Sequence, residues 1–138
     1  MSPPIRFAVA LTLALTAIAL PALAREPECA TGSHAETRAC LERLTASVEA
    51  ELQRAEARLA ARIALWDAES PEVRRALRLL DADRKAYRDY RAAQCELQAS
   101  AAAGGNGAED LRAMCMIEQD RARMALLYAQ LDRFGLAD

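Results

Sequence analysis

Aromatic residues and histidine are scarce in this chain of 138 residues. Phe, Trp and Tyr together make up 4% of it, and His34 is the single histidine. Hydrophobic residues reach 53%, but alanine dominates them, and alanine favours a helix while burying little surface. The sequence also lacks the apolar-polar alternation of strands and any solenoid repeat. The composition therefore predicts a strongly helical protein with a thin core.

The motifs of nucleotide, metal and catalytic sites are missing as well. The glycines at 104, 105 and 107 lack the lysine and the Ser or Thr of a P-loop, and no C-x-x-C pair occurs. Zinc sites usually contain closely spaced ligand pairs, whereas ten residues separate Cys29 from Cys40 and nineteen separate Cys95 from Cys115. We expect no catalytic residue, no metal and no cofactor, and hence a protein that is not an enzyme.

The N-terminal segment has the pattern of a secretory signal peptide. Arg6 precedes an apolar run over 7–20, and the sequence ALA at 22–24 forms a cleavage site. The run is shorter than the about 20 residues that span a membrane. We therefore expect residues 1–24 to be a signal peptide and 25–138 to be a single domain without a membrane span. It would lie in the periplasm of a Gram-negative bacterium or outside the cell.

The charge of the mature chain is small. Removal of 1–24 takes away one of the 18 basic residues and none of the 20 acidic ones, which leaves a net charge of -3. Acidic and basic residues are interspersed, so the footprint of a nucleic-acid-binding protein is absent.

A first long helix is expected to begin at a capping box formed by Ser33 and Glu36. Apolar residues then recur at steps of three and four, which places them on one face of the helix. We expect Trp66, the last of them, to close the core. This apolar stripe contains Leu41, Leu44, Val48, Leu52, Ala55, Leu59, Ile63 and Trp66.

Two further helices follow. Ser70 is a suitable N-cap with Pro71 at the first helical position, and this helix should run to about Ala102, with charges at 81–85 weakening its packing. Its apolar residues include Val73, Leu77, Leu80, Tyr87, Tyr90 and Leu97. Acidic residues should open the third helix after the glycine loop. Its apolar residues are Leu111, Met114, Ile117, Met124, Leu127, Leu131 and Phe134.

Short connections between long helices make neighbours antiparallel. The sequence therefore predicts an all-α fold of three long antiparallel helices, either an up-down-up bundle or an extended hairpin with a third helix, stapled by disulfides. The pairing stays open at this stage. Cys95 and Cys115 are equally far along the chain from the second turn, and Cys40 and Cys95 are equally far from the first. Two pairings are therefore open. Either Cys95 pairs with Cys115 and Cys29 with Cys40, or Cys40 pairs with Cys95 and Cys29 with Cys115. The first is slightly preferred, because it needs no long-range register.

The four cysteines combine with an aromatic-x-x-aromatic-Arg-x-x-x-Cys segment and a Cys-x7-Arg-x-x-Leu segment. In this combination the chain resembles the lysozyme inhibitor LprI-like N-terminal domain family over residues 29 to 134. The positions that carry the resemblance, besides the cysteines, include Glu36, Tyr87, Tyr90, Arg91, Arg123 and Leu126. The chain departs from the family at Tyr87, where tryptophan is typical, at Ala92, where an aspartate commonly follows the arginine, and at Asp120, where threonine is frequent. The resemblance implies an exported helical domain that binds a protein, with lysozyme as the partner.

The motif side chains also have a structural interpretation. Both tyrosines should pack against a neighbouring helix, with their hydroxyl groups on polar partners. Arg91 and Arg123 should meet acids such as Glu36, Glu96 or Glu118 across the bundle.

Two acidic helix connections are candidate contacts for a basic partner such as lysozyme. Their residues are Asp67, Glu69, Asn106, Glu109 and Asp110. The alternative function is that of a periplasmic structural or chaperone-like helical protein that binds other envelope proteins. A poorly packed third helix, with Arg121 on its apolar stripe and Met114, Met116 and Met124 as adaptable contacts, would favour that alternative.

Overall fold

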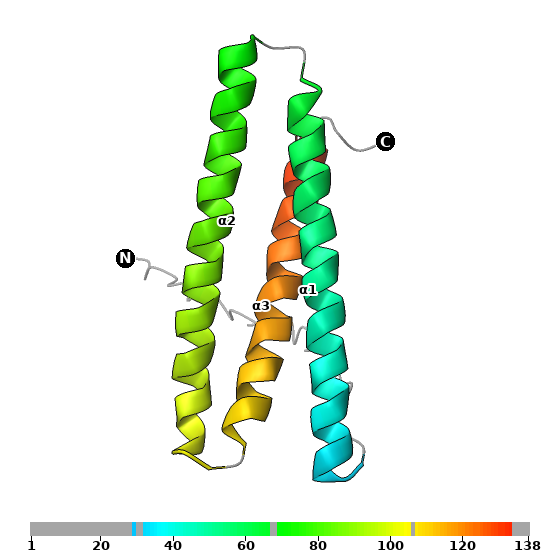
Figure 1. Ribbon diagram of the computed structural model, residues 1–138, viewed down its shortest axis with the longest axis vertical. Helices are drawn as coiled ribbons and strands as arrows, with labels where there is room; N and C mark the ends of the chain where they lie inside the picture. The colour runs from blue at the N-terminus through cyan, green and yellow to red at the C-terminus, as the bar shows by residue number, and fades with distance from the viewer. Residues whose placement is uncertain (1–28, 30–31, 67–68, 106, 134–138) are drawn as a thin grey trace, which may run out of the picture.

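The protein is all-α in a computed structural model that describes Cys29 and residues 32–66, 69–105 and 107–133 (Figure 1). Helix α1 is His34–Ala64, α2 is Ser70–Ala99, and α3 is Ala108–Arg133, with a 3-10 turn, η1, at Ser100–Ala102. No strand occurs in this described part. None of its helices is long and apolar enough to cross a membrane. The expected all-α fold of three long helices with disulfide staples is confirmed.

Helix α1 begins with the capping box that the sequence predicts. The backbone N–H of Ser33 donates to Glu36 Oε2 at 2.7 Å, and the backbone N–H of Glu36 donates to Ser33 Oγ at 3.4 Å. The bonds from Ser33 hold the pKa of Glu36 below its usual value, because they stabilise the charged carboxylate. Gly32 precedes the cap with φ +133°, and a Cβ there would lie 2.9 Å from Glu36 Oε2, so this position requires glycine.

The start of α2 differs from the expectation. Ser70 is the first helical residue rather than the N-cap, which is Glu69, and no side chain caps this end. Pro71 still lies in the first turn, where its missing N–H has no intrahelical acceptor. At the other end, α2 stops at Ala99, and η1 covers the three residues expected to continue it. Ala103 and Gly104 then turn the chain with φ of 48° and 80°.

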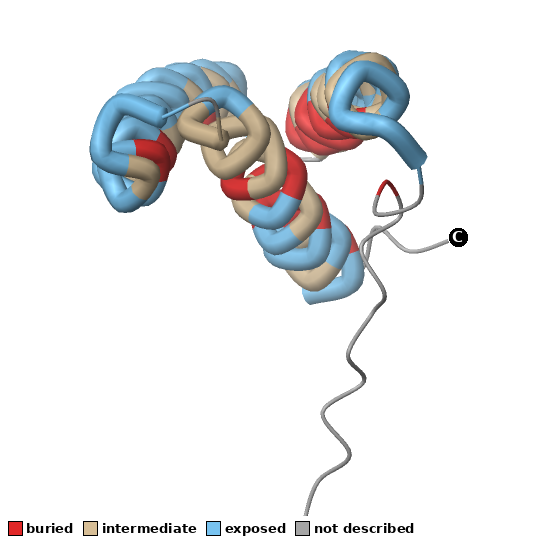
Figure 2. The backbone as a smooth tube through the Cα atoms, turned by 90° about the horizontal axis from the view of Figure 1, so that it is seen from below, coloured by how far each residue is buried: buried red, intermediate tan, exposed pale blue. Residues whose placement is uncertain are grey.

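Helix α3 lies between α1 and α2 and packs against both (Figure 2). The two helices that are neighbours in sequence, α1 and α2, diverge from their connection and have fewer contacts with each other (Figure 1). The alternative in which Cys40 pairs with Cys95 across the first hairpin is accordingly not formed. The physical reason is that α3 presents an apolar stripe to α1, while charges interrupt the stripe of α2.

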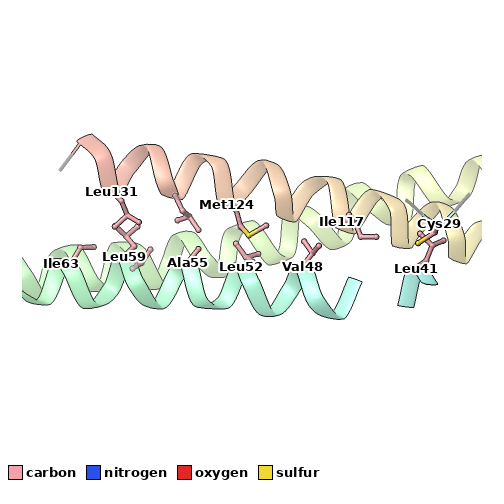
Figure 3. Close-up of a cluster of buried hydrophobic side chains, with 12 residues drawn as sticks. Cys29, Leu41, Val48, Leu52, Ala55, Leu59, Ile63, Ile117, Met124 and Leu131 are labelled. Atoms are coloured by element: carbon pink, nitrogen blue, oxygen red, sulfur yellow. The ribbon is translucent and has the colours of Figure 1, made fainter. Parts of the chain in front are cut away.

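The core forms mainly between α1 and α3 (Figure 3). Six of the eight stripe residues predicted for the first helix are buried, and Leu44 and Trp66 pack against them. Leu127 of α3 is fully buried, and Leu80 is the one large apolar residue of α2 in the core. Leu97 was expected in the stripe of α2, but it is 68% exposed. Phe134 lies outside the described residues.

Both disulfides join residues that are close in sequence. Cys29 is bonded to Cys40 and Cys95 to Cys115, with Cα–Cα distances of 5.6 and 5.4 Å. These are the pairs of the first alternative above. The first bond fixes the segment before α1 onto that helix, and the second fixes the end of α2 to the start of α3. Each bond thus holds an end of the fold where the chain enters or reverses.

Candidate partner-binding site

A buried carboxylate lies at the centre of the interface between α2 and α3. Asp120 on α3 is 1% exposed. Tyr87 Oη donates to its Oδ1 at 2.6 Å, and Arg91 Nη1 donates to its Oδ2 at 2.6 Å. Arg91 also lies 3.5 Å from a carboxylate oxygen of Glu49 on α1. The buried charge is therefore paired and hydrogen-bonded, as burial requires, and the cluster joins all three helices.

Arg123 extends this cluster by one turn of α3. It donates to the carboxylate of Asp83 on α2, and its guanidinium carbon lies 5.3 Å from the centre of the Tyr87 ring, in cation–π geometry. Burial and then the hydrogen bond to Asp120 raise the pKa of Tyr87 well above its ordinary value of 10.0. The phenol therefore stays neutral and acts as a donor to the buried carboxylate. We call Asp83, Tyr87, Arg91, Asp120 and Arg123 the polar cluster.

The two arginines of the motif find acids across the bundle, but other acids than expected. Arg91 and Arg123 use Asp120 and Asp83 in place of the acids at 36, 96 and 118. Glu36 is occupied by the cap of α1, and Glu96 accepts two hydrogen bonds from Arg112 at 2.9 and 3.1 Å. The sequence did contain a signal for Asp120, because position 120 lies on the apolar stripe between positions 117 and 124.

Two further motif residues lie outside the polar cluster. The packing and hydrogen bond expected for the tyrosines hold for Tyr87, but Tyr90 is 54% exposed. Three residues along a helix correspond to 300°, so Tyr90 is turned about 60° away from Tyr87. Leu126 is also exposed, on α3. Both are therefore available at the surface of this chain.

The charged segment at 81–85 contributes to packing. Asp83 holds Arg123, and Arg84 donates to the backbone carbonyl of Glu56 on α1, whose carboxylate lies 3.4 Å from Arg84 Nε. The expectation was that these charges weaken the packing of α2 without breaking the helix, and α2 does run unbroken through them. They replace apolar contacts with ion pairs that reach both neighbouring helices.

The acids that open α3 make ion pairs with the first turns of α1. Arg38 lies 3.2 Å from Glu109 and 3.5 Å from Asp110, and His34 Nδ1 lies 3.5 Å from Asp110. These two acidic candidates therefore fasten α3 to α1. Glu69 is exposed at the opposite end of the bundle. Asp67 and Asn106 lie outside the described residues.

An open cleft lies beside these ion pairs, between α1 and α3. It has a volume of about 340 Å³ and is lined by three acids, Glu42, Glu49 and Glu109, and by Arg112. Glu109 is also paired with Arg38, and Glu49 lies 3.5 Å from Arg91. The remaining lining residues are small or apolar, among them Met116. A smaller cavity of about 60 Å³ lies between α1 and α2, and Glu49 borders both spaces. We call the larger space the acidic cleft.

The third helix is the best packed of the three rather than the loosest. It contacts both other helices, Met124 is buried, and Met114 packs against the core. Arg121 is half-buried and has an interaction partner. The loose third helix that would have favoured the chaperone-like alternative is therefore not observed.

The described residues contain no group of three or more His, Cys, Asp or Glu side chains arranged to hold a metal ion. All four cysteines are in disulfides, so none of them is a thiolate nucleophile or ligand.

Comparison with known proteins agrees with this arrangement. A model of the family described as "Lysozyme inhibitor LprI" matches residues 26–127. Searches of curated proteins and of solved structures found no match. The matched range covers most of the chain. It includes both disulfides, the polar cluster and the whole acidic cleft. This chain therefore belongs to the LprI lysozyme inhibitor family.

Proposed function

We propose that this chain is an exported, non-enzymatic inhibitor that binds lysozyme through the acidic cleft. In this proposal residues 1–24 direct export, and 25–138 act as one domain in the periplasm of a Gram-negative bacterium or outside the cell. The observation that carries the proposal is the open, acid-lined cleft in a chain of the lysozyme inhibitor family. Lysozyme is a basic enzyme, so carboxylates at a binding surface would attract it.

The walls of the acidic cleft are held rigid before any partner binds. Its walls are two long helices that share the apolar core. Arg38 ties Glu109 of one wall to the other, and the Cys95–Cys115 disulfide fixes the start of α3. A surface that is rigid before it binds loses less conformational entropy on binding, which increases affinity. Of the two acidic connections, this proposal uses the one that contains Glu109.

A lysis assay tests the proposal. Purified protein should slow the clearing of a bacterial cell-wall suspension by lysozyme, and added salt should weaken the effect. Glu42→Lys should raise the inhibition constant about five-fold, which corresponds to roughly 1 kcal/mol for one exposed charge. Glu51→Lys is the matched control, because nine residues place Glu51 on the opposite face of α1. Undiminished lysis at excess protein would refute the proposal. Equal effects of the two variants on the inhibition constant would show that lysozyme does not bind at the cleft.

A further inference from the structure

Helix α2 carries a second apolar stripe on an exposed side next to its buried face. Leu79, Tyr90 and Leu97 are 60%, 54% and 68% exposed, and Ala86 and Ala93 are exposed between them. Positions 79, 86 and 93 are seven residues apart, as are 90 and 97. Positions 86, 90, 93 and 97 follow steps of four, three and four, the spacing by which one helix packs against another along its length, and Asp83 occupies the position between 79 and 86. Figure 2 shows how little of α2 is buried in the single chain.

We propose that this stripe binds a second copy of the same chain, with the two α2 helices antiparallel. The stripe complements itself when the two-fold axis passes near position 88. In that register Leu79 lies opposite Leu97 of the second copy, and Tyr90 lies opposite its Ala86. Large side chains therefore face small ones at the centre, and leucine faces leucine at both ends, which fills the interface without voids. In the remaining layer Ala93 lies opposite Asp83 of the second copy. The carboxylate of Asp83 accepts a hydrogen bond from Arg123 of its own chain.

The charges beside the stripe determine both the partner and the direction. Arg78 and Lys85 precede position 88, and Asp89 and Glu96 follow it on the same flank of α2. In the antiparallel register Arg78 faces Glu96 of the second copy, and Lys85 faces its Asp89. A parallel two-fold pair would place this flank of the two copies on opposite sides of the seam, so neither of these contacts would form. This pattern fits a copy of itself better than a helix of unrelated sequence.

The existing ion pairs on this flank are compatible with such a pair. Lys85 Nζ lies 2.6 Å from Asp89 within the same helix, and both side chains are mostly exposed. Two such pairs meeting across a two-fold axis form a ring of alternating charges. Glu96 bonds to Arg112, yet its side chain remains 68% exposed, so a second donor can approach its oxygens.

Association through α2 leaves the acidic cleft open. Every residue that lines this cleft belongs to α1 or α3. The inference therefore does not depend on the proposed function. Self-association and lysozyme inhibition can therefore be measured separately on each variant, and one can be lost while the other is retained.

Sedimentation velocity of the purified exported protein over a concentration series tests the inference. The wild type should change from monomer to dimer as its concentration rises. Leu97→Glu should raise the dissociation constant at least ten-fold, because it places a charge in the apolar seam. Leu126→Glu is the control, since Leu126 is equally an exposed leucine but lies on α3. Helix content by circular dichroism should be unchanged in both variants.

A charge exchange tests the direction of the pair. Lys85→Glu should weaken the dimer, and Lys85→Glu combined with Asp89→Lys should restore it, because the exchange recreates both contacts. Three results would overturn the inference: a monomer at every concentration up to about 1 mM, a dimer that Leu97→Glu leaves intact, or no recovery in the double variant.

Discussion

Helix α3 is held to its two neighbours by different chemistry. Its interface with α1 consists of interdigitating apolar side chains along most of both helices (Figure 3). Its interface with α2 contains one disulfide, a buried carboxylate and two arginines, and Leu80 is the only large apolar side chain that α2 buries. Apolar contact is tolerant of small shifts, whereas hydrogen bonds to a buried charge require one geometry. The difference indicates that the α1–α3 pair supplies most of the stability and that the polar cluster sets the register of α2.

The role of the disulfides follows from the same comparison. In an alanine-rich chain the apolar surface available to a third helix is small, and α2 directs much of its own apolar surface outward. The Cys95–Cys115 bond compensates, because it keeps α2 and α3 adjacent whatever the strength of their contacts. The acidic cleft, by contrast, is built on the better packed pair.

The largest effect is expected from a cavity in the α1–α3 interface. Leu127 is fully buried, so Leu127→Ala should lower the free energy of unfolding by about 4 kcal/mol. Leu126→Ala is the matched control, because this adjacent leucine is 61% exposed and should cost less than about 0.5 kcal/mol. Urea unfolding followed by circular dichroism measures both. Similar losses in the two variants would show that the core is not where the described packing places it.

A smaller effect, confined to one helix, is expected when the second disulfide is removed. Cys95→Ser with Cys115→Ser should cost about 3 kcal/mol on the chain-entropy account of a loop of this length. Hydrogen exchange should speed up first in α2, while the amides at the centre of α1 keep their protection. Cys29→Ser with Cys40→Ser provides the comparison, since that bond does not touch α2. Equal loss of protection in α1 and α2 would argue against two interfaces of different strength.

Much of the α1–α3 interface could be predicted from the sequence because its signals are local. A capping box and a periodic stripe depend on residues three or four apart, and both appear as predicted. Which helix lies in the middle is a different kind of question. It depends on how much apolar surface each helix can offer to the other two, and periodicity within one helix does not rank them.

The polar cluster was only half predictable for the same reason. Arg91 and Arg123 were expected to find acids across the bundle, but the choice among many surface carboxylates required the arrangement of the helices. Tyr87 and Asp120, two of the three positions noted as departures from the family pattern, bond to each other. This hydrogen bond joins two positions that are 33 residues apart in the sequence.

The smallest expected effect tests the hydrogen bond between Tyr87 and Asp120. Tyr87→Phe removes the donor but leaves Arg91 on the carboxylate, so it should cost about 1 to 2 kcal/mol of unfolding free energy at neutral pH.

The raised pKa of Tyr87 makes this stabilisation depend on pH. The unfolded chain loses the phenolic proton near pH 10, while the folded chain retains it to higher pH. The stabilisation is therefore complete below about pH 10 and declines as the pH rises further toward the folded pKa. Urea unfolding at pH 8 and pH 11 should show a steeper alkaline loss in the wild type than in Tyr87→Phe. Tyr90→Phe serves as the control, because the exposed Tyr90 lies outside the polar cluster, and an equal change in slope there would contradict the assignment to Tyr87.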